Sequence, residues 1–283
     1  MKSHIGKFLT RNLIDNPILI AGIGRSGTSV LLTALGMHPK ILCGYGEAPL
    51  MRNFGELVDR IEFSDAREYY TETLFAPKKY LFDHLRRICF EYVVGTNYGC
   101  FRATREFRNL GFSILKRQYW CAKVLPRESE YRGLQGLFPG LKALNISRNG
   151  LDVVHSRTRF HGFRDLSFEQ HCRTWAESVK DCRYLATTAT ALEVRHEELV
   201  ADPEQFFHKV FAFLDLPYHE GPAEFVKNNL MLPLDQPSED GVNVKQILEQ
   251  RDPPYTDWTA EQKETFTRIA GNAMRELGYE IPF

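Results

Sequence analysis

The 283-residue sequence contains no apolar run that approaches the roughly 18–20 residues needed for a membrane-spanning helix. Its first residues also lack the apolar segment and the small-residue cleavage site that are typical of a signal peptide. We therefore expect no membrane span and a cytoplasmic location.

The sequence also lacks a net charge, because 36 lysines and arginines balance 36 aspartates and glutamates. This balance gives no reason to expect a nucleic-acid partner. The hydrophobic content of 43% and the charged content of 25% are ordinary for a folded globular protein.

Metal-binding and disulfide patterns are missing as well. The six cysteines form no CxxC pair, and no cluster of cysteine and histidine has the spacing of zinc ligands. His196-Glu197 is not followed by the second histidine of an HExxH motif. We expect reduced thiols and no bound metal.

A glycine-rich turn near the N-terminus is the most informative feature that is present. The apolar residues Pro17 to Ala21 predict a buried strand, and residues 29–37 predict a helix. Gly22, Gly24 and Gly27 lie between them. In a strand–loop–helix unit of this kind, backbone N–H groups and the helix dipole favour a phosphate or sulfate group.

This turn differs from the loop that binds nucleoside triphosphates. Thr28 stands where that loop has its lysine, and the positive charge is at Arg25 instead. Taken alone, the segment is also compatible with a tight strand-to-helix turn that carries an incidental arginine.

A second anion site is predicted after a second strand. Residues 141–147 read as a buried strand, Asn149-Gly150 as a turn, and a helix is expected from about residue 151. Arg148 at the end of the strand and Ser156 on the second helical turn are placed to contact one anion. They could equally be a surface arginine and a helix serine that never meet.

The remaining pattern completes the predicted architecture. A further strand is expected to end at Val194, and capping signals at Asp202 and Thr259 predict two more helices. Strands that alternate with helices indicate an α/β fold with a P-loop-like, doubly wound parallel sheet flanked by helices. We expect a single domain over residues 1–283, with a helical insertion at about 50–118.

Four segments resemble motifs of the sulfotransferases that use 3′-phosphoadenosine-5′-phosphosulfate (PAPS), and they occur in the order found in that family. Residues 24–29 (GRSGTS) with His38-Pro39 resemble the 5′-phosphosulfate loop, and residues 148–156 (RNGLDVVHS) resemble the 3′-phosphate motif. Residues 120–126 (WCAKVLP) and 194–199 (VRHEEL) are similar to two further segments. Gly150 replaces the usual proline, and His196 replaces the usual tyrosine.

The resemblance assigns roles to individual residues. It implies that Glu47 is the general base and that Lys123 and Arg25 stabilise charge on the transferred group. The residues alone are also compatible with a solvated loop glutamate at position 47 and a surface lysine at position 123. The donor PAPS, whose product is 3′,5′-adenosine diphosphate (PAP), would be bound by residues of the two motifs: Gly24, Arg25, Ser26, Gly27, Thr28, Ser29, Arg148, Ser156 and His196. Lys245 and Arg251 are candidates for completing the 3′-phosphate site.

The implied reaction is metal-free, in-line transfer of a sulfuryl group to a hydroxyl or amine. The acceptor could be a small molecule, a carbohydrate, a lipid or a peptide, and the sequence carries no signal for the oligomeric state. Two alternatives are a P-loop kinase or NTPase, which would need a lysine at position 28, and a sulfotransferase-like protein that binds PAP without turnover.

Overall fold

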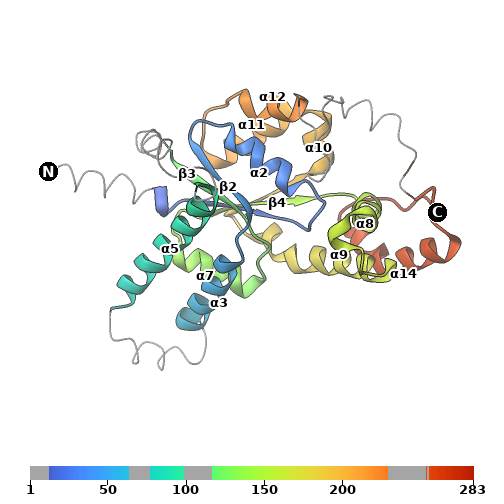
Figure 1. Cartoon of the computed structure of the whole chain (residues 1–283), viewed down its shortest axis with the longest axis horizontal. Coiled ribbons are helices and arrows are strands. Elements are labelled where there is room, and N and C mark those ends of the chain that lie inside the picture. The colour runs from blue at the N-terminus through green and yellow to red at the C-terminus, as the bar shows by residue number, and fades with distance from the viewer. Residues whose placement is uncertain (1–12, 64–76, 99–116, 229–252, 254) are drawn as a thin grey trace. The chain divides into compact units, whose positions relative to one another are not determined.

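The computed structural model describes residues 13–63, 77–98, 117–228, 253 and 255–283. The strands are β1 (Pro17–Ala21), β2 (Ile41–Glu47), β3 (Tyr119–Lys123), β4 (Lys142–Ser147) and β5 (Ala191–Arg195). The helices, shown in Figure 1, are α2 (Thr28–Gly36), α3 (Pro49–Phe63), α5 (Lys78–Tyr98), α7 (Glu128–Leu137), α8 (Gly150–Arg159), α9 (Phe168–Cys182), α10 (His196–Ala201), α11 (Pro203–Leu214), α12 (Gly221–Asn228) and α14 (Ala260–Glu276). Two short 3₁₀ helices are η1 (His161–Phe163) and η2 (Arg183–Thr187).

The five strands form one sheet in the order β2-β3-β1-β4-β5, and β3 pairs in parallel with both β1 and β2. Every residue of β1 is buried, which is typical of an inner strand covered on both faces. The expected α/β fold with a parallel sheet flanked by helices is confirmed, and β2 and β3 add two strands to those that the sequence pattern indicates.

The chain divides into two compact units. Unit 1 comprises residues 1–21, 31–144 and 188–192, and unit 2 comprises residues 22–30, 145–187 and 193–283. The single domain expected over residues 1–283 stays a prediction. In the described ranges, no helix has both the length and the apolar character to cross a bilayer.

Unit 1 has its core around β1 and β3. Trp120 on β3 is fully buried, and its ring makes an edge-to-face contact with Phe138 at 5.7 Å between centroids. Its indole Nε1 donates to the carbonyl oxygen of Ile14 at 3.0 Å, so the polar atom of this core residue is satisfied. Helices α3 and α5 occupy the described part of the expected insertion; residues 64–76 and 99–116 lie outside the described residues.

Unit 2 has its core between α8, α9 and α14. Trp175 of α9 stacks on Phe266 of α14 with ring centroids 6.4 Å apart. The Asn149 side chain caps α8 by accepting a hydrogen bond from the Leu151 amide at 2.9 Å. The Thr259 side chain and Gln262 form a capping box on α14. These caps fix where the two helices begin.

A glycine pair lets α3 and α7 approach each other closely in unit 1 (Figure 1). A Cβ atom added to Gly133 would lie 1.9 Å from the carbonyl oxygen of Gly55. A Cβ added to Gly55 would lie 2.2 Å from the carbonyl oxygen of Glu130. Both obstacles are backbone atoms, so the helices would have to separate to accept a side chain.

We expect Gly133→Ala to destabilise the protein by about 1–3 kcal/mol, the usual cost of overpacking. Gly136→Ala on the same helix is the matched control, since its Cβ would meet Val58 at an ordinary 3.6 Å. The control should have unchanged or slightly raised stability because alanine favours helix. Urea titration followed by circular dichroism measures both, and equal stability of the two variants would contradict the close helix contact.

Candidate active site

The turn between β1 and α2 has an unusual backbone. Gly22, Arg25 and Gly27 all have positive φ, at 144°, 82° and 90°. An alanine at position 22 would place its Cβ 2.5 Å from the Ile146 carbonyl oxygen, so this position needs glycine. Left-handed residues within a turn form a concave run of amide groups that suits an anion.

Ser26 gives this turn an unsatisfied donor. Its side chain is 0% exposed, and its hydroxyl has no hydrogen-bond partner among the described residues. A buried hydroxyl without a partner is costly unless a ligand or water satisfies it. The orphan hydroxyl beside the left-handed turn therefore fits a ligand with acceptor oxygens, such as the phosphosulfate group expected there.

Arg148 and Ser156, the two residues of the predicted second anion site, both contact Arg25. Arg148 Nη1 donates to the Arg25 carbonyl oxygen at 3.2 Å, and Arg25 Nε donates to Ser156 Oγ at 3.0 Å. The Arg25 guanidinium also lies 4.5 Å from the ring centroid of Phe160. Arg148 is 3.7 Å from the Asp152 carboxylate. Two guanidinium groups and a hydroxyl thus meet where the turns after β1 and β4 come together in unit 2.

His196 lies at the start of α10 and packs against the same turn. A Cβ added to Gly27 would lie 2.5 Å from His196 Cδ2, so glycine at position 27 leaves room for the ring. Burial, with a smaller effect from the charge of Arg148, lowers the pKa of His196 to about 3. The imidazole is therefore neutral near pH 7 and offers a flat, uncharged face.

Glu197 ties together three segments around the site and was not identified from the sequence. One carboxylate oxygen accepts a hydrogen bond from the Asn149 amide at 2.8 Å, and the other accepts from the Tyr279 hydroxyl at 2.9 Å. Burial and the neighbouring carboxylate raise the pKa of Tyr279, so its hydroxyl keeps the donated proton. The signal available in the sequence was an acidic residue directly after His196, close to the end of a predicted strand.

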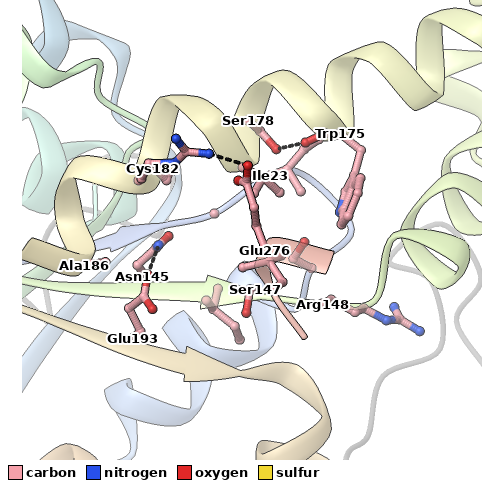
Figure 2. A pocket seen from close by; sticks show the side chains of 16 residues that line it. Ile23, Asn145, Ser147, Arg148, Trp175, Ser178, Cys182, Ala186, Glu193 and Glu276 are labelled. Atoms are coloured by element: carbon pink, nitrogen blue, oxygen red, sulfur yellow. Dashed lines mark hydrogen bonds and ion pairs between the residues drawn. The ribbon is translucent and has the colours of Figure 1, made fainter. Parts of the chain in front are cut away.

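A cavity of about 300 Å³ opens beside the turn within unit 2 (Figure 2). Its walls come from the 22–26 turn, from β4 and β5, and from α9 and the end of α14. Ser26 and Arg148 are the predicted site residues that line it. In Figure 2 the Arg148 side chain points away from Ser178, Cys182 and Glu276.

Glu47 and Lys123, the predicted base and its cationic neighbour, lie together in unit 1. The Lys123 ammonium is 3.6 Å from the Glu47 carboxylate, and the Glu47 side chain is 75% exposed. They are register partners on β2 and β3, although an irregularity separates this pair from the Cys43–Cys121 pair. The Ala48 amide donates to the Lys123 carbonyl oxygen at 3.0 Å, which holds the end of β2 at this position.

The predicted donor-site residues Gly24 to Ser29, Arg148, Ser156 and His196 all belong to unit 2, whereas Glu47 and Lys123 belong to unit 1. Lys245 and Arg251 lie outside the described residues. Among the residues that are described, no group of three or more potential metal ligands is found.

Arg157 is a further residue of this region that the sequence patterns left unassigned. It is 4% exposed and lies directly after Ser156 on α8. The available signal was its position: it follows Val153 and Val154 at helical spacing and so falls on the buried side of the helix.

Comparisons with known proteins bear on this site. A family model described as the sulfotransferase family matches residues 17–220. A protein-tyrosine sulfotransferase of Drosophila melanogaster is 24% identical over 228 residues, which cover 77% of this chain and 42% of the relative. The chain spans about half the length of the curated relatives it matches.

Solved structures show the same fold. A sulfotransferase domain from the curacin biosynthetic pathway is 16% identical with a TM-score of 0.52, covering 94% of this chain and 99% of that one. A mouse sulfotransferase complexed with PAP is 12% identical with a TM-score of 0.50, covering 92% of this chain and 85% of that one.

The lowered pKa of His196 predicts a contribution to the pH dependence of stability. The unfolded chain binds a proton at this side chain below about pH 6.5, whereas the folded protein resists it until about pH 3. Stability of the wild-type protein should therefore fall as the pH drops through this window. His196→Gln should show a shallower fall of Tm between pH 7 and 4, and His208→Gln, at an exposed histidine, should follow the wild-type curve. Parallel curves for all three proteins would contradict the burial of the neutral ring.

Proposed function

The chain belongs to the sulfotransferase family, and we propose that it transfers a sulfuryl group from PAPS to a hydroxyl or amine of an acceptor. The observation that supports this most strongly is the contact between the two anion motifs. Arg148 donates to the backbone of Arg25, and Arg25 donates to Ser156, so the turns that resemble the 5′-phosphosulfate and 3′-phosphate motifs form one continuous site.

The donor would bind across this site. We assign the amides of the 24–29 turn and the unpartnered Ser26 hydroxyl to the 5′ end, where Thr28 and Ser29 add hydroxyls at the start of α2. Arg148 and Ser156 would hold the 3′-phosphate. The neutral ring of His196 would lie toward the adenine, and Lys245 and Arg251 stay candidates for the 3′-phosphate.

The chemistry would use Glu47, Lys123 and Arg25. As the acceptor oxygen or nitrogen forms a bond to sulfur, its proton passes to the Glu47 carboxylate. The bond between sulfur and the bridging phosphate oxygen breaks, and its electron pair stays with PAP. The cationic groups of Lys123 and Arg25 would stabilise the charge on the sulfonate and on the leaving oxygen.

The ion pair between Glu47 and Lys123 suits these two roles. At 3.6 Å the ammonium and the carboxylate are neighbours at the ends of two adjacent strands, and this supports a pairing of a general base with a charge-stabilising cation. Glu47 is exposed enough to meet an acceptor that arrives from solvent. Because the phosphosulfate bond is already activated, orientation and charge are the main contributions asked of the protein.

An ATP-dependent kinase is not favoured. Thr28 occupies the position of the phosphate-binding lysine, and Arg148 follows β4 where a magnesium-binding acid would be expected. The other alternative is PAP binding without turnover. It differs from the proposal because such a protein would release no PAP from PAPS with any acceptor.

The acceptor class is best approached experimentally. The curated relatives are protein-tyrosine sulfotransferases, so tyrosine peptides belong in the first panel, together with phenols, carbohydrates and lipids. A cytoplasmic location is likewise proposed from the sequence alone, and subcellular fractionation would test it.

Glu47→Gln should lower kcat by about 10²–10⁴-fold, because the amide cannot accept the acceptor proton. PAP affinity should stay at the wild-type value. Glu56→Gln, which removes a partner of the surface residue Arg60, is the matched control and should keep full activity. Turnover is measured as PAP release from PAPS with the acceptor found in the panel. A fully active Glu47→Gln enzyme would remove this residue from the mechanism, and PAP binding without turnover by the wild-type protein on every acceptor would favour the non-catalytic alternative.

Arg148→Ala should weaken PAP binding by about 10–100-fold, the usual effect of losing charge-assisted hydrogen bonds to a phosphate. Arg148→Lys keeps the charge without the planar fork and should show a smaller loss. Isothermal titration calorimetry measures both affinities, and ligand-free Tm values confirm that the variants fold. Wild-type affinity in Arg148→Ala would contradict the proposed 3′-phosphate site.

A further inference from the structure

Arg157 is a buried cation without a charged or hydrogen-bonding partner among the residues that the structure describes. Its side chain makes no hydrogen bond or ion pair with any residue in the described ranges, and its Nε atom is buried and unpaired. Burial alone lowers its pKa, with no carboxylate acting against it. Arg52, by contrast, donates twice to the Glu130 carboxylate, at 2.8 and 3.1 Å.

The titratable group that faces Arg157 offers no compensating charge. His171 of α9 is 1% exposed, and its Nδ1 also has no hydrogen-bond partner among the described residues. Burial and the positive charge of Arg157 both lower the pKa of His171, which favours the neutral ring. In the described part of the chain, Arg157 Nε and His171 Nδ1 are thus both buried without a hydrogen-bond partner. Such an arrangement is unfavourable unless a ligand completes it.

The guanidinium is held against the glycine turn. It lies 4.2 Å from the ring centroid of Phe163, and a Cβ added to Gly24 would lie 3.8 Å from Arg157 Nη1. The neighbouring Ser156 hydroxyl accepts from Arg25 on the other side of the same turn. Two residues of α8 thus contact this turn: Ser156 through Arg25, and Arg157 through its guanidinium next to Gly24.

We propose that Arg157 is an additional anion-binding residue of the donor site, acting on the phosphate or phosphosulfate at the 5′ end of the nucleotide. The inference rests on the proposed function. The nucleotide would supply the negative charge that no described residue offers to the Arg157 guanidinium. Arg148 and Ser156 serve the opposite end of the nucleotide, so the two arginines have separable effects.

The test compares the affinities of PAP, 5′-AMP and 3′-AMP for wild-type protein, Arg157→Met, Arg157→Lys and Arg159→Met, measured by isothermal titration calorimetry. Arg157→Met should bind PAP and 5′-AMP about tenfold or more weakly, while its affinity for 3′-AMP stays unchanged. Arg159→Met is the matched control: Arg159 is an exposed residue of the same helix, 3.0 Å from Asp257, and its loss should change affinity less than about twofold.

Ligand-free stability separates binding from packing. Methionine has a similar volume and removes an uncompensated charge, so the Tm of Arg157→Met without ligand should equal or exceed that of the wild type. A fall in this Tm together with wild-type affinity for PAP would overturn the proposal and leave Arg157 as a packing partner of Phe163. A loss confined to 3′-AMP would also overturn it.

Two further outcomes are decisive. If Arg157→Met does not fold, Arg157→Lys gives the answer, because an ammonium does not reproduce the planar guanidinium and should weaken 5′-AMP about threefold or more. Equal affinities of Arg157→Lys and wild type would then overturn the inference. A wild-type protein that binds none of the nucleotides contradicts the proposed function itself, whereas wild-type binding that is unaffected by the Arg157 variants contradicts this inference alone.

Discussion

The hydrogen bond from Arg148 to the carbonyl oxygen of Arg25 is the contact on which the proposed donor site depends. It joins the turn after β1 to the turn after β4, and Arg25 continues the connection to Ser156 on α8. In a doubly wound sheet, ligands bind beyond the carboxyl ends of the strands where the chain changes direction. The bond places two cationic groups there. The Glu197 carboxylate holds the turn after β4 by accepting a hydrogen bond from the Asn149 amide.

The turns and helices that carry the residues of the proposed donor site could be predicted from the sequence because their signals are local. Glycines at positions 22, 24 and 27 indicated a strand-to-helix turn, and the spacing of Arg148 and Ser156 indicated a strand end followed by a helix. The direction of the Arg25 side chain was not predictable. Its position over Phe160 and against Ser156 depends on the left-handed backbone of that residue and on a helix more than 120 residues away in the sequence.

The pairing of Glu47 with Lys123 shows where sequence reasoning ends. Neither β2 nor β3 was expected as a strand, since β2 is interrupted by glycines and β3 has only five residues, so both carry little periodic signal. With the regular register set by Cys43 and Cys121, Lys123 would face residue 45. The irregularity between Cys43 and Glu47 advances β2 by two residues and brings the carboxylate opposite the ammonium. The two glycines of β2 are compatible with such a shift, but its size is decided by the pairing between the strands.

The strained turn at residues 22–27 has a thermodynamic consequence. Three left-handed residues, one of them an arginine, are ordered when the chain folds, and the Ser26 hydroxyl is enclosed at the same time. The entropy lost in arranging these groups is therefore part of the cost of folding and does not weaken ligand binding. Association of a phosphorylated nucleotide should consequently need little backbone rearrangement around the glycines.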